Sequence, residues 1–443
     1  MSARGKKLQL SSFQIILCSF AGVILLGAIL LSLPFASAEN YTPSFSDALF
    51  TSTSAVCVTG LVVRDTFQGW TLFGKCVIIS LIQIGGMGVI TIALLISCFA
   101  GRKISLFQRS VMKEAISAEK IGGIVRLTKR ILRITFGCEL LGALALYPVF
   151  LPEYGSLNAC GYALFHSISA FCNAGFDLCG ETAAYSSLTA YISNPLVNIT
   201  IMLLIIIGGL GFRTWDDFFA YKGHFRRYSL QTKVILSTTF VLIITAALYF
   251  YCFEFGGLTG KDRILASLFQ SVTPRTAGFN TVDQDALSDS GKMITIILML
   301  IGGAPGSTAG GMKVTTAAIL VFAAFSVFRH DEDTNLFKRR LEHEILRKAA
   351  ALLLMYLILF LGSAMIISRL ENLPLLSCMY ETASAIGTVG LTLGLTPSLG
   401  RISQGILIFL MFFGRVGGLT IIFATFKSRI YGRKFPHEDI SVG

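Results

Sequence analysis

The stretch LFTSTSAVCVTGL at positions 49–61 recurs in altered form as LFHSISAFCNAGF (164–176), LFQSVTPRTAGF (268–279) and MYETASAIGTVGL (379–391). Each copy has an aromatic residue in second place, a hydroxyl-bearing residue two positions later and a glycine near its end. These closing glycines, Gly60, Gly175, Gly278 and Gly390, are separated by 115, 103 and 112 residues. Such regular spacing of matched segments indicates four copies of one structural unit.

The composition around these segments is that of an integral membrane protein. Of the 443 residues, 53% are hydrophobic and only 14% are charged, which is too few to coat a soluble domain. Lipid satisfies no backbone hydrogen bonds, and the apolar runs are continuous rather than alternating, so helices are favoured over a barrel. Most runs reach the 18–20 residues that a spanning helix needs; they cover 13–34, 70–100, 128–151, 195–212, 231–256, 291–303, 314–328, 346–368 and 402–428.

The charge pattern predicts an orientation. The net charge is +12, and basic residues gather in 101–133, 222–233 and 329–348, whereas 152–194 and 371–400 contain no lysine or arginine. The positive-inside rule therefore places the basic segments, together with both basic termini, in the cytoplasm of a cell-membrane protein. This pattern gives no reason to expect a nucleic-acid partner, whereas anionic membrane lipids remain one explanation of the basic segments.

Each repeat is predicted to contain a transmembrane helix, a short half-helix with a glycine-ended loop, and a second transmembrane helix. The short segments 43–56, 158–170, 262–273 and 376–386 cannot span a bilayer, so we expect them to enter and return on the outer side. The fold class is thus an all-α polytopic membrane protein with four pseudo-repeats around a central pore. The expected boundaries of the repeats are 1–110, 111–228, 229–340 and 341–443.

Four loops that meet on one axis would suit a cation. A ring of backbone carbonyls can replace the water shell of an ion, and glycine permits the backbone angles that such a ring requires. The half-helices would also aim their negative dipole ends at the pore. The predicted selectivity filter comprises Cys57, Val58, Thr59, Gly60, Cys172, Asn173, Ala174, Gly175, Arg275, Thr276, Ala277, Gly278, Gly387, Thr388, Val389 and Gly390.

Glycines cluster again downstream of each closing glycine, at Gly85-Gly86, Gly208-Gly209, Gly302-Gly303 and Gly414 with Gly417-Gly418. Close helix packing explains three of these clusters. In the third repeat, IGGAPGSTAGGM (301–312) interrupts the apolar run with five glycines and a proline. A continuous helix is unfavourable there, so we expect a broken helix with a flexible loop at membrane depth or, as the alternative, a simple structural kink.

The ordered set of motifs VTGL (58–61), NAGF (173–176), TPRTAGFN (273–280) and GTVGLT (387–392) resembles the KtrB-type membrane subunits of potassium transporters, in the superfamily that also includes TrkH and plant HKT proteins. The resemblance covers essentially the whole chain. It implies K⁺ as the transported ion, because glycine at all four closing positions accompanies K⁺ preference in that superfamily. It also implies a homodimer and a soluble, KtrA-like ring of nucleotide-binding regulatory subunits, with nucleotide bound only by that partner.

The resemblance further implies an intramembrane gate. Its matching positions are Gly302, Gly303, Ala304, Pro305, Gly306, Ser307, Thr308, Ala309, Gly310 and Gly311, with Arg415 as an electrostatic barrier beside them. An internal salt bridge is the alternative explanation of an arginine at this depth. Lys313 is expected to snorkel to the cytoplasmic surface, and Arg275, His166 and Glu381 to brace the filter loops.

Other functions are less consistent with the sequence. A Na⁺-selective or Na⁺/K⁺-coupled relative of the same fold remains the alternative, although a coupled carrier with alternating access would predict inverted repeats and paired intramembrane acids. An enzyme or electron carrier would need metal or haem ligands, and the five histidines show no suitable spacing. Cys160, Cys172 and Cys179 lie in or next to the predicted outer part of the second repeat, where one disulfide is conceivable.

Overall fold

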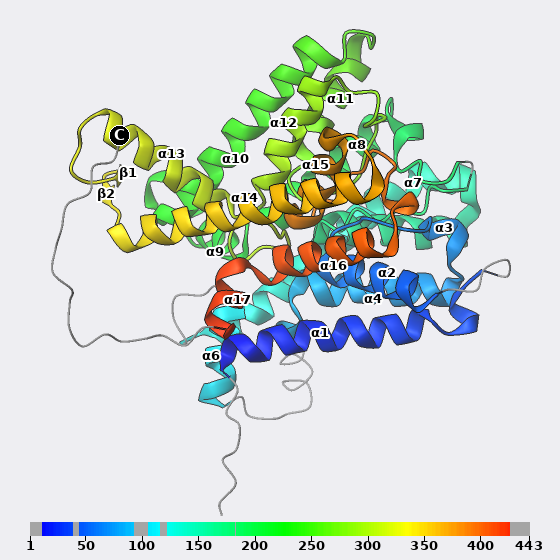
Figure 1. Ribbon diagram of the computed structural model, residues 1–443, viewed down its shortest axis with the longest axis horizontal. Coiled ribbons are helices and arrows are strands. Elements are labelled where there is room, and N and C mark those ends of the chain that lie inside the picture. Colours follow the sequence, from blue (N-terminus) through cyan, green and yellow to red (C-terminus); the bar gives the residue numbers. More distant parts are fainter. Residues whose placement is uncertain (1–10, 39–43, 93–104, 116–121, 182, 426–443) are drawn as a thin grey trace, which may run out of the picture.

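The computed structural model describes residues 11–38, 44–92, 105–115, 122–181 and 183–425, and it is predominantly helical (Figure 1). The basic residues of both termini, on which part of the orientation prediction depends, lie outside these ranges. Four helices are long and apolar enough to cross a membrane by themselves, and two bent helix pairs raise this number to six within the described residues. The fold is the all-α, four-repeat membrane architecture that the sequence predicts.

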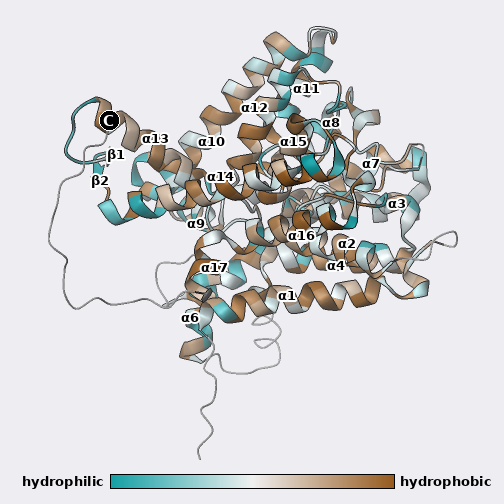
Figure 2. Cartoon of the chain, viewed as in Figure 1, coloured by the Kyte–Doolittle hydropathy of each residue, from teal (hydrophilic) through white to brown (hydrophobic). Residues whose placement is uncertain are grey.

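The first helix of each repeat lies on the outside of the bundle. These outer helices are α1 (Ser12–Leu31), the first part of α7 (Ile124–Cys172), α10 (Leu230–Tyr249) and α14 (His343–Glu371). Large apolar side chains of these helices, such as Leu26, Leu141, Phe240 and Leu354, are more than half exposed, as expected for surfaces that face lipid. Figure 2 shows that the ribbons of α1, α10 and α14 are coloured largely as hydrophobic.

The second element of each repeat is a short pore helix. These are α2 (Phe45–Cys57), the part of α7 that follows Gly155, α11 (Gly260–Val272) and α15 (Leu375–Gly387). The predicted break between 151 and 158 is present inside α7, where Gly155 has φ 71° and ψ 166°. Phe50, Phe165, Phe269 and Tyr380, the aromatic residues of the repeated motif, are all buried here.

The inner helices line the centre of the bundle and end earlier than the apolar runs predict. They are α4 (Leu72–Met87), α8 (Pro195–Gly209), α12 (Asp289–Leu300) and α16 (Arg401–Val416). The chain turns by 96° between α8 and α9 (Phe212–Tyr221) and by 91° between α16 and α17 (Gly418–Thr425). Gly88, Gly211 and Gly417 stand at three of these ends with φ of 86–88°, a backbone angle that other residues resist.

In the third repeat, an inner loop (residues 302–311) replaces the turn and leads into α13 (Val314–Phe328). Gly302 N–H donates to the Met312 carbonyl at 2.7 Å, so the two ends of the loop lie side by side. The remaining elements are short: α3 (Thr66–Gly69), α6 (Leu106–Ala115), the hairpin β1 (Asn335–Leu336) and β2 (Arg339–Arg340), and single turns at Pro34–Ala36, Thr189–Tyr191, Phe225–Arg227, Phe250–Glu254 and Thr396–Ser398.

Candidate functional site

The four closing glycines meet in a ring at the centre of the molecule. A Cβ atom on Gly60 would lie 2.5 Å from the Ala174 carbonyl oxygen, so no side chain fits there. The other three glycines are placed in the same way: each lies against the carbonyl oxygen of the residue just before the closing glycine of the next loop. The distance from an added Cβ to that oxygen is 2.7 Å for Gly175 and Ala277, 2.4 Å for Gly278 and Val389, and 2.3 Å for Gly390 and Thr59. The loops therefore follow one another in chain order, and the fourth returns to the first.

Each loop adopts the same backbone conformation. All four closing glycines have positive φ, between 69° and 97°. The residue two places before each glycine is also left-handed, and these residues are Val58, Asn173, Thr276 and Thr388. Such angles are costly for residues other than glycine, so the surrounding structure must enforce them. The third copy keeps this pattern although it is one residue shorter than the others.

Hydroxyl groups within the same repeat hold these loops in place. Gly60 N–H donates to Ser54 Oγ, and Gly390 N–H donates to Ser384 Oγ, both at 3.0 Å. In the second repeat, Ser169 Oγ donates to the Phe176 carbonyl at 2.7 Å. Thr273 Oγ1 donates in the same way to Phe279 in the third repeat. Each loop is thus fastened to the pore helix from which it emerges.

Side chains behind the ring brace the segments that follow it. Glu381 accepts hydrogen bonds from Leu393 N–H at 3.1 Å and from Thr396 Oγ1 at 2.6 Å. His166 Nε2 accepts from Leu178 N–H at 3.3 Å. Arg275 points away from the ring, with its guanidinium donating to Thr239 Oγ1 on α10 at 3.1 Å. All three side chains are buried, and their role in bracing the filter loops stays a prediction.

Below the ring, glycines of the inner helices pack directly on the ends of the pore helices. A Cβ atom on Gly85, Gly208 or Gly414 would lie 2.0–2.1 Å from the carbonyl oxygen of Val56, Phe171 or Ile386, respectively. The close packing predicted for the first, second and fourth clusters is therefore confirmed. Its partner is the main chain of the pore helix in the same repeat.

The inner loop lies directly beneath the ring and is bonded to the other repeats. Ala304 N–H donates to the Gly209 carbonyl at 2.9 Å, and Gly311 N–H donates to the Gly414 carbonyl at 3.1 Å. Thr308 Oγ1 donates to the Phe171 carbonyl at 3.1 Å, at the end of the second pore helix. The loop also approaches the fourth filter segment, since a Cβ on Gly310 would lie 2.1 Å from Thr388 Oγ1.

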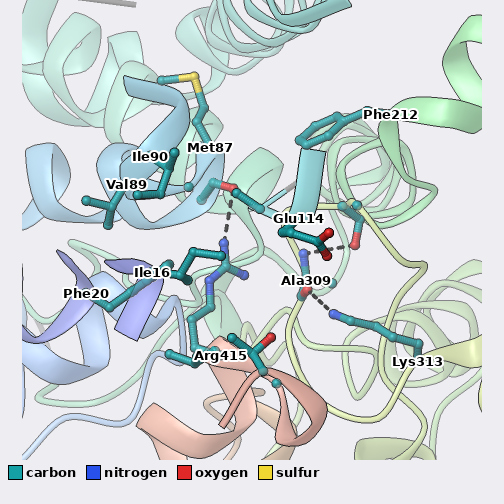
Figure 3. A pocket seen from close by; sticks show the side chains of 18 residues that line it. Ile16, Phe20, Met87, Val89, Ile90, Glu114, Phe212, Ala309, Lys313 and Arg415 are labelled. Atoms are coloured by element: carbon teal, nitrogen blue, oxygen red, sulfur yellow. Dashed lines mark hydrogen bonds between the residues drawn. The ribbon is translucent and has the colours of Figure 1, made fainter. Parts of the chain in front are cut away.

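Arg415 joins three repeats through its guanidinium group. It donates to the Thr308 carbonyl of the inner loop and to the Gly85 carbonyl of α4, and it reaches the Gly86 carbonyl at 3.1 Å (Figure 3). Among the described residues no carboxylate lies within salt-bridge distance of it. The alternative of an internal salt bridge is thus not supported.

Lys313 behaves differently from its prediction. Its ammonium group does not extend to the cytoplasmic surface but turns back to the Ala309 carbonyl at 2.9 Å and the Gly310 carbonyl at 3.4 Å (Figure 3). The reason is that the loop leaves carbonyl groups without helical partners at this depth, and these carbonyls attract the cation. Lys313 and Arg415 both line a cavity of about 140 Å³ on the far side of the loop from the ring, together with Glu114 of α6.

One buried acid was not anticipated. Glu139 lies within α7, is 3% exposed, and accepts hydrogen bonds from Gln83 Nε2 at 2.9 and 3.2 Å. Its oxygen Oε1 is 4.0 Å from Cys172 Sγ, at the base of the second loop. A single acid inside an apolar run of the sequence is the signal that could have drawn attention to it. Cys160, Cys172 and Cys179 are free thiols, so none of them forms a disulfide.

Comparison with known proteins places this geometry in context. A family model described as "TrkH: Cation transport protein" matches residues 9–430. The potassium/sodium uptake protein NtpJ of Enterococcus hirae is 39% identical over 100% of this chain and 99% of its own length. The Ktr system potassium uptake protein B of Bacillus subtilis is also 39% identical, over 97% of this chain and 96% of its own length. The crystal structure of the potassium transporter TrkH from Vibrio parahaemolyticus superposes with a TM-score of 0.74 at 22% identity, covering 96% of this chain and 86% of that one.

Proposed function

Because the chain belongs to the TrkH family of cation transport proteins, which are transporters and not enzymes, we propose that it moves K⁺ across the cell membrane through the ring of closing glycines. The observation that carries this proposal is the ring formed by Gly60, Gly175, Gly278 and Gly390. A Cβ atom added to any of them would lie 2.3–2.7 Å from a carbonyl oxygen of the neighbouring loop. Main-chain carbonyls of all four loops thus approach one another at the ring, an arrangement that suits a carbonyl-lined filter.

The chemistry at the ring suits a weakly hydrated cation. Four pore helices end there and direct the negative ends of their dipoles toward the centre. The hydroxyl groups of Thr59 and Thr388 are buried at the ring without a hydrogen-bond partner among the described residues. Polar oxygens left unpaired in this way can contact a passing ion or its water. Preference for K⁺ over Na⁺ rests on glycine at all four closing positions, the pattern of the K⁺-selective members of the superfamily.

We assign the inner loop as the gate and Arg415 as its latch, that is, the residue whose hydrogen bonds hold the loop closed. The loop lies between the ring and the cytoplasmic cavity, so an ion leaving the ring must pass it. The guanidinium group adds a positive charge beside that path and ties the loop to α4 and α16 at the same time. Opening therefore requires these hydrogen bonds to break or to be exchanged for others.

Regulation would come from outside the chain. The Bacillus subtilis and Vibrio alginolyticus relatives are each named as protein B of a Ktr system for potassium uptake. We propose a KtrA-like nucleotide-binding ring as the partner of this chain and a homodimer as its membrane form. A second candidate function, Na⁺-linked or mixed K⁺/Na⁺ uptake, is favoured by one observation: the Enterococcus relative is a potassium/sodium uptake protein by name.

Ion uptake in cells that lack their own K⁺ transporters tests the filter assignment. Gly60→Ser introduces a Cβ that would lie 2.5 Å from the Ala174 carbonyl at a residue with φ 94°, so the ring must distort. We expect lower K⁺/Na⁺ discrimination than in the unsubstituted protein. Gly137→Ser is the matched control, because nothing lies within 4 Å of a Cβ at that position. Unchanged discrimination in Gly60→Ser would remove the filter assignment.

A further inference from the structure

A second cavity lies beside the inner loop, and Arg415 is not among the residues that line it. It has a volume of about 390 Å³ and opens between α9, α10, α13 and the start of α14, close to the β1–β2 hairpin (Figure 1). This volume is within the range of roughly 300–1,000 Å³ that is usual for small-molecule sites. Neither the ring nor the predicted gate mechanism requires a cavity in this position.

The lining of this cavity is amphipathic. Its walls are built from aliphatic side chains, including Leu230, Val234, Ile319 and Ile345. Arg213 and Gln231 supply the polar part, where the guanidinium group donates to the Gln231 amide oxygen at 3.4 Å. The Asp217 carboxylate of the same helix also interacts with the Arg213 charge, so an anionic occupant would share this guanidinium group with residues of the chain. An occupant that matches the lining is apolar along its length and carries a negatively charged group at one end.

The surroundings indicate where such an occupant would come from. The elements that frame the cavity adjoin two of the basic segments, 222–233 and 329–348, which the positive-inside rule assigns to the cytoplasmic leaflet. Phe322 and Phe325 of α13 and Phe218 of α9 are largely exposed, as expected for side chains that contact acyl chains. Basic pockets between helices on this side of a membrane bind anionic lipid headgroups.

The inner loop forms part of the cavity wall. Pro305 lines it directly, and Thr315 follows the loop at the start of α13. The residue before Arg213 is also bonded to the loop, since Phe212 N–H donates to the Gly306 carbonyl at 2.7 Å. A molecule held by Arg213 would therefore touch the inner loop at Pro305, three residues before the Thr308 carbonyl that Arg415 holds.

We propose that this cavity binds one anionic phospholipid of the cytoplasmic leaflet, with its phosphate at Arg213 and an acyl chain along the aliphatic wall, and that the bound lipid stabilises the inner loop. The binding site stands on its own geometry. The effect on transport rests on the proposed function, because it requires the inner loop to be the gate.

Native mass spectrometry of the purified full-length chain tests the binding site. The probes are phosphatidylglycerol and phosphatidylcholine with identical acyl chains. We expect the unsubstituted protein to retain phosphatidylglycerol preferentially, Arg213→Gln to lose the preference, and Ile319→Trp, which fills the cavity, to lose the bound lipid. Arg347→Gln is the control, because this arginine is exposed near the start of α14 and does not line the cavity. Equal retention of the two lipids, or unchanged retention in both cavity variants, would overturn the proposal, as would finding a segment of the chain itself in the cavity by cross-linking.

Flux from proteoliposomes then tests the link to the loop. We expect K⁺ flux through the unsubstituted protein and Arg347→Gln to change when phosphatidylglycerol replaces phosphatidylcholine, and flux through Arg213→Gln to be insensitive to this exchange. If Arg213→Gln loses lipid but responds to composition like the unsubstituted protein, the link to the loop is wrong. If no variant carries K⁺ under any condition, the proposed function fails while the binding measurement still decides the site.

Discussion

The ring of closing glycines and the inner loop differ in where their hydrogen bonds go. Each ring segment is fastened within its own repeat, as Gly60 is by Ser54 and Gly390 by Ser384. The inner loop has bonds within its own repeat and also bonds to the other repeats, through Gly209, Gly414 and the guanidinium group of Arg415. Release of the loop therefore has to break bonds between repeats, whereas the bonds from each ring segment to its own pore helix can remain.

The inner loop and the ring also differ in the energies of the hydrogen bonds that hold them. A neutral hydrogen bond contributes about 0.5–1.5 kcal/mol net, and one to a charged group about 1.5–3 kcal/mol. The loop has several neutral bonds to other repeats and one charged residue that holds it to α4. In the gate proposed above, release of the loop would thus cost on the order of several kcal/mol, which differential binding of a partner would have to supply. The ring also has a side-chain bond between repeats, from Asn173 Nδ2 to Thr276 Oγ1 at 3.2 Å, and left-handed residues in all four segments define its shape.

The largest effect on K⁺ uptake is expected from Gly390→Ala, which places a side-chain atom within the ring. The added Cβ would lie 2.3 Å from the Thr59 carbonyl oxygen at a residue with φ 97°, and a strained residue of this kind costs about 1–3 kcal/mol. We expect K⁺ uptake to fall by about tenfold or more, since each 1.4 kcal/mol corresponds to a factor of ten. Gly362→Ala, where a Cβ meets nothing within 4 Å, should transport normally. Normal uptake by Gly390→Ala would show that the ring tolerates side chains and is not the filter.

Next in size is Arg415→Ala, which removes the charged bonds of the loop. We expect faster K⁺ flux that depends less on the regulatory partner, with K⁺/Na⁺ discrimination unchanged because the ring keeps its own bonds. Tracer flux in proteoliposomes measures both quantities. Arg415→Lys keeps the charge but cannot make the same forked contacts, so it separates electrostatic repulsion from latching. The same flux in all three proteins would show that Arg415 neither latches nor blocks.

A smaller change is expected from Thr308→Val, which removes one neutral bond between the loop and the second pore helix. The lost bond to the Phe171 carbonyl is worth about 1 kcal/mol, so flux should rise by roughly fivefold, less than in Arg415→Ala. Ser307→Ala is the matched control, because Ser307 Oγ donates only within the loop, to the Ala304 carbonyl. If the control raises flux more than Thr308→Val does, bonds inside the loop matter more than bonds between repeats.

The smallest effect concerns the outer side of the ring. Asp177 lies two residues after Gly175, and burial raises the pKa of its carboxyl group to about 7, with neighbouring Asp65 adding to the shift. As external pH rises through 7, Asp177 becomes charged and should attract cations, so uptake should increase modestly over this interval. Asp177→Asn should flatten the profile. The inner loop is remote from external protons, so Arg415→Ala should keep the dependence of uptake on external pH. Uptake that no longer depends on pH in Arg415→Ala, but still does in Asp177→Asn, would contradict the assignment of the pH effect to Asp177.

The repeat and its centre could be predicted from the sequence because both depend on local signals. Matched motifs and the spacing of Gly60, Gly175, Gly278 and Gly390 are sufficient to indicate four equivalent loops. The bends at Gly211 and Gly417 and the end of α4 before Gly88 were not predicted, because the apolar runs 70–100 and 402–428 continue beyond Gly88 and Gly417 and the run 195–212 extends to the residue after Gly211. Hydropathy reports whether a segment prefers lipid and contains no information about its direction within the protein.

The contacts of Lys313, Arg415 and Glu139 could not be predicted for a different reason. Each depends on residues more than fifty positions away or on a loop that has no regular structure, as with Glu139 and Gln83. Sequence spacing on a helix places side chains on a face but does not say which main-chain carbonyls are left without partners. That information arises only when the four repeats pack together, which is why Lys313 turns inward rather than outward.

The cyclic order of the ring within one polypeptide has an evolutionary consequence. In an assembly of four identical subunits, every substitution at the axis appears four times and is usually destructive. Here a single codon change alters only one of the four ring segments. The third segment, which is shorter and contains Arg275, already differs from the others in this way. Gene duplication followed by fusion thus allows the four sides of one conduction path to diverge separately, so that ion preference can be adjusted in small steps rather than all at once.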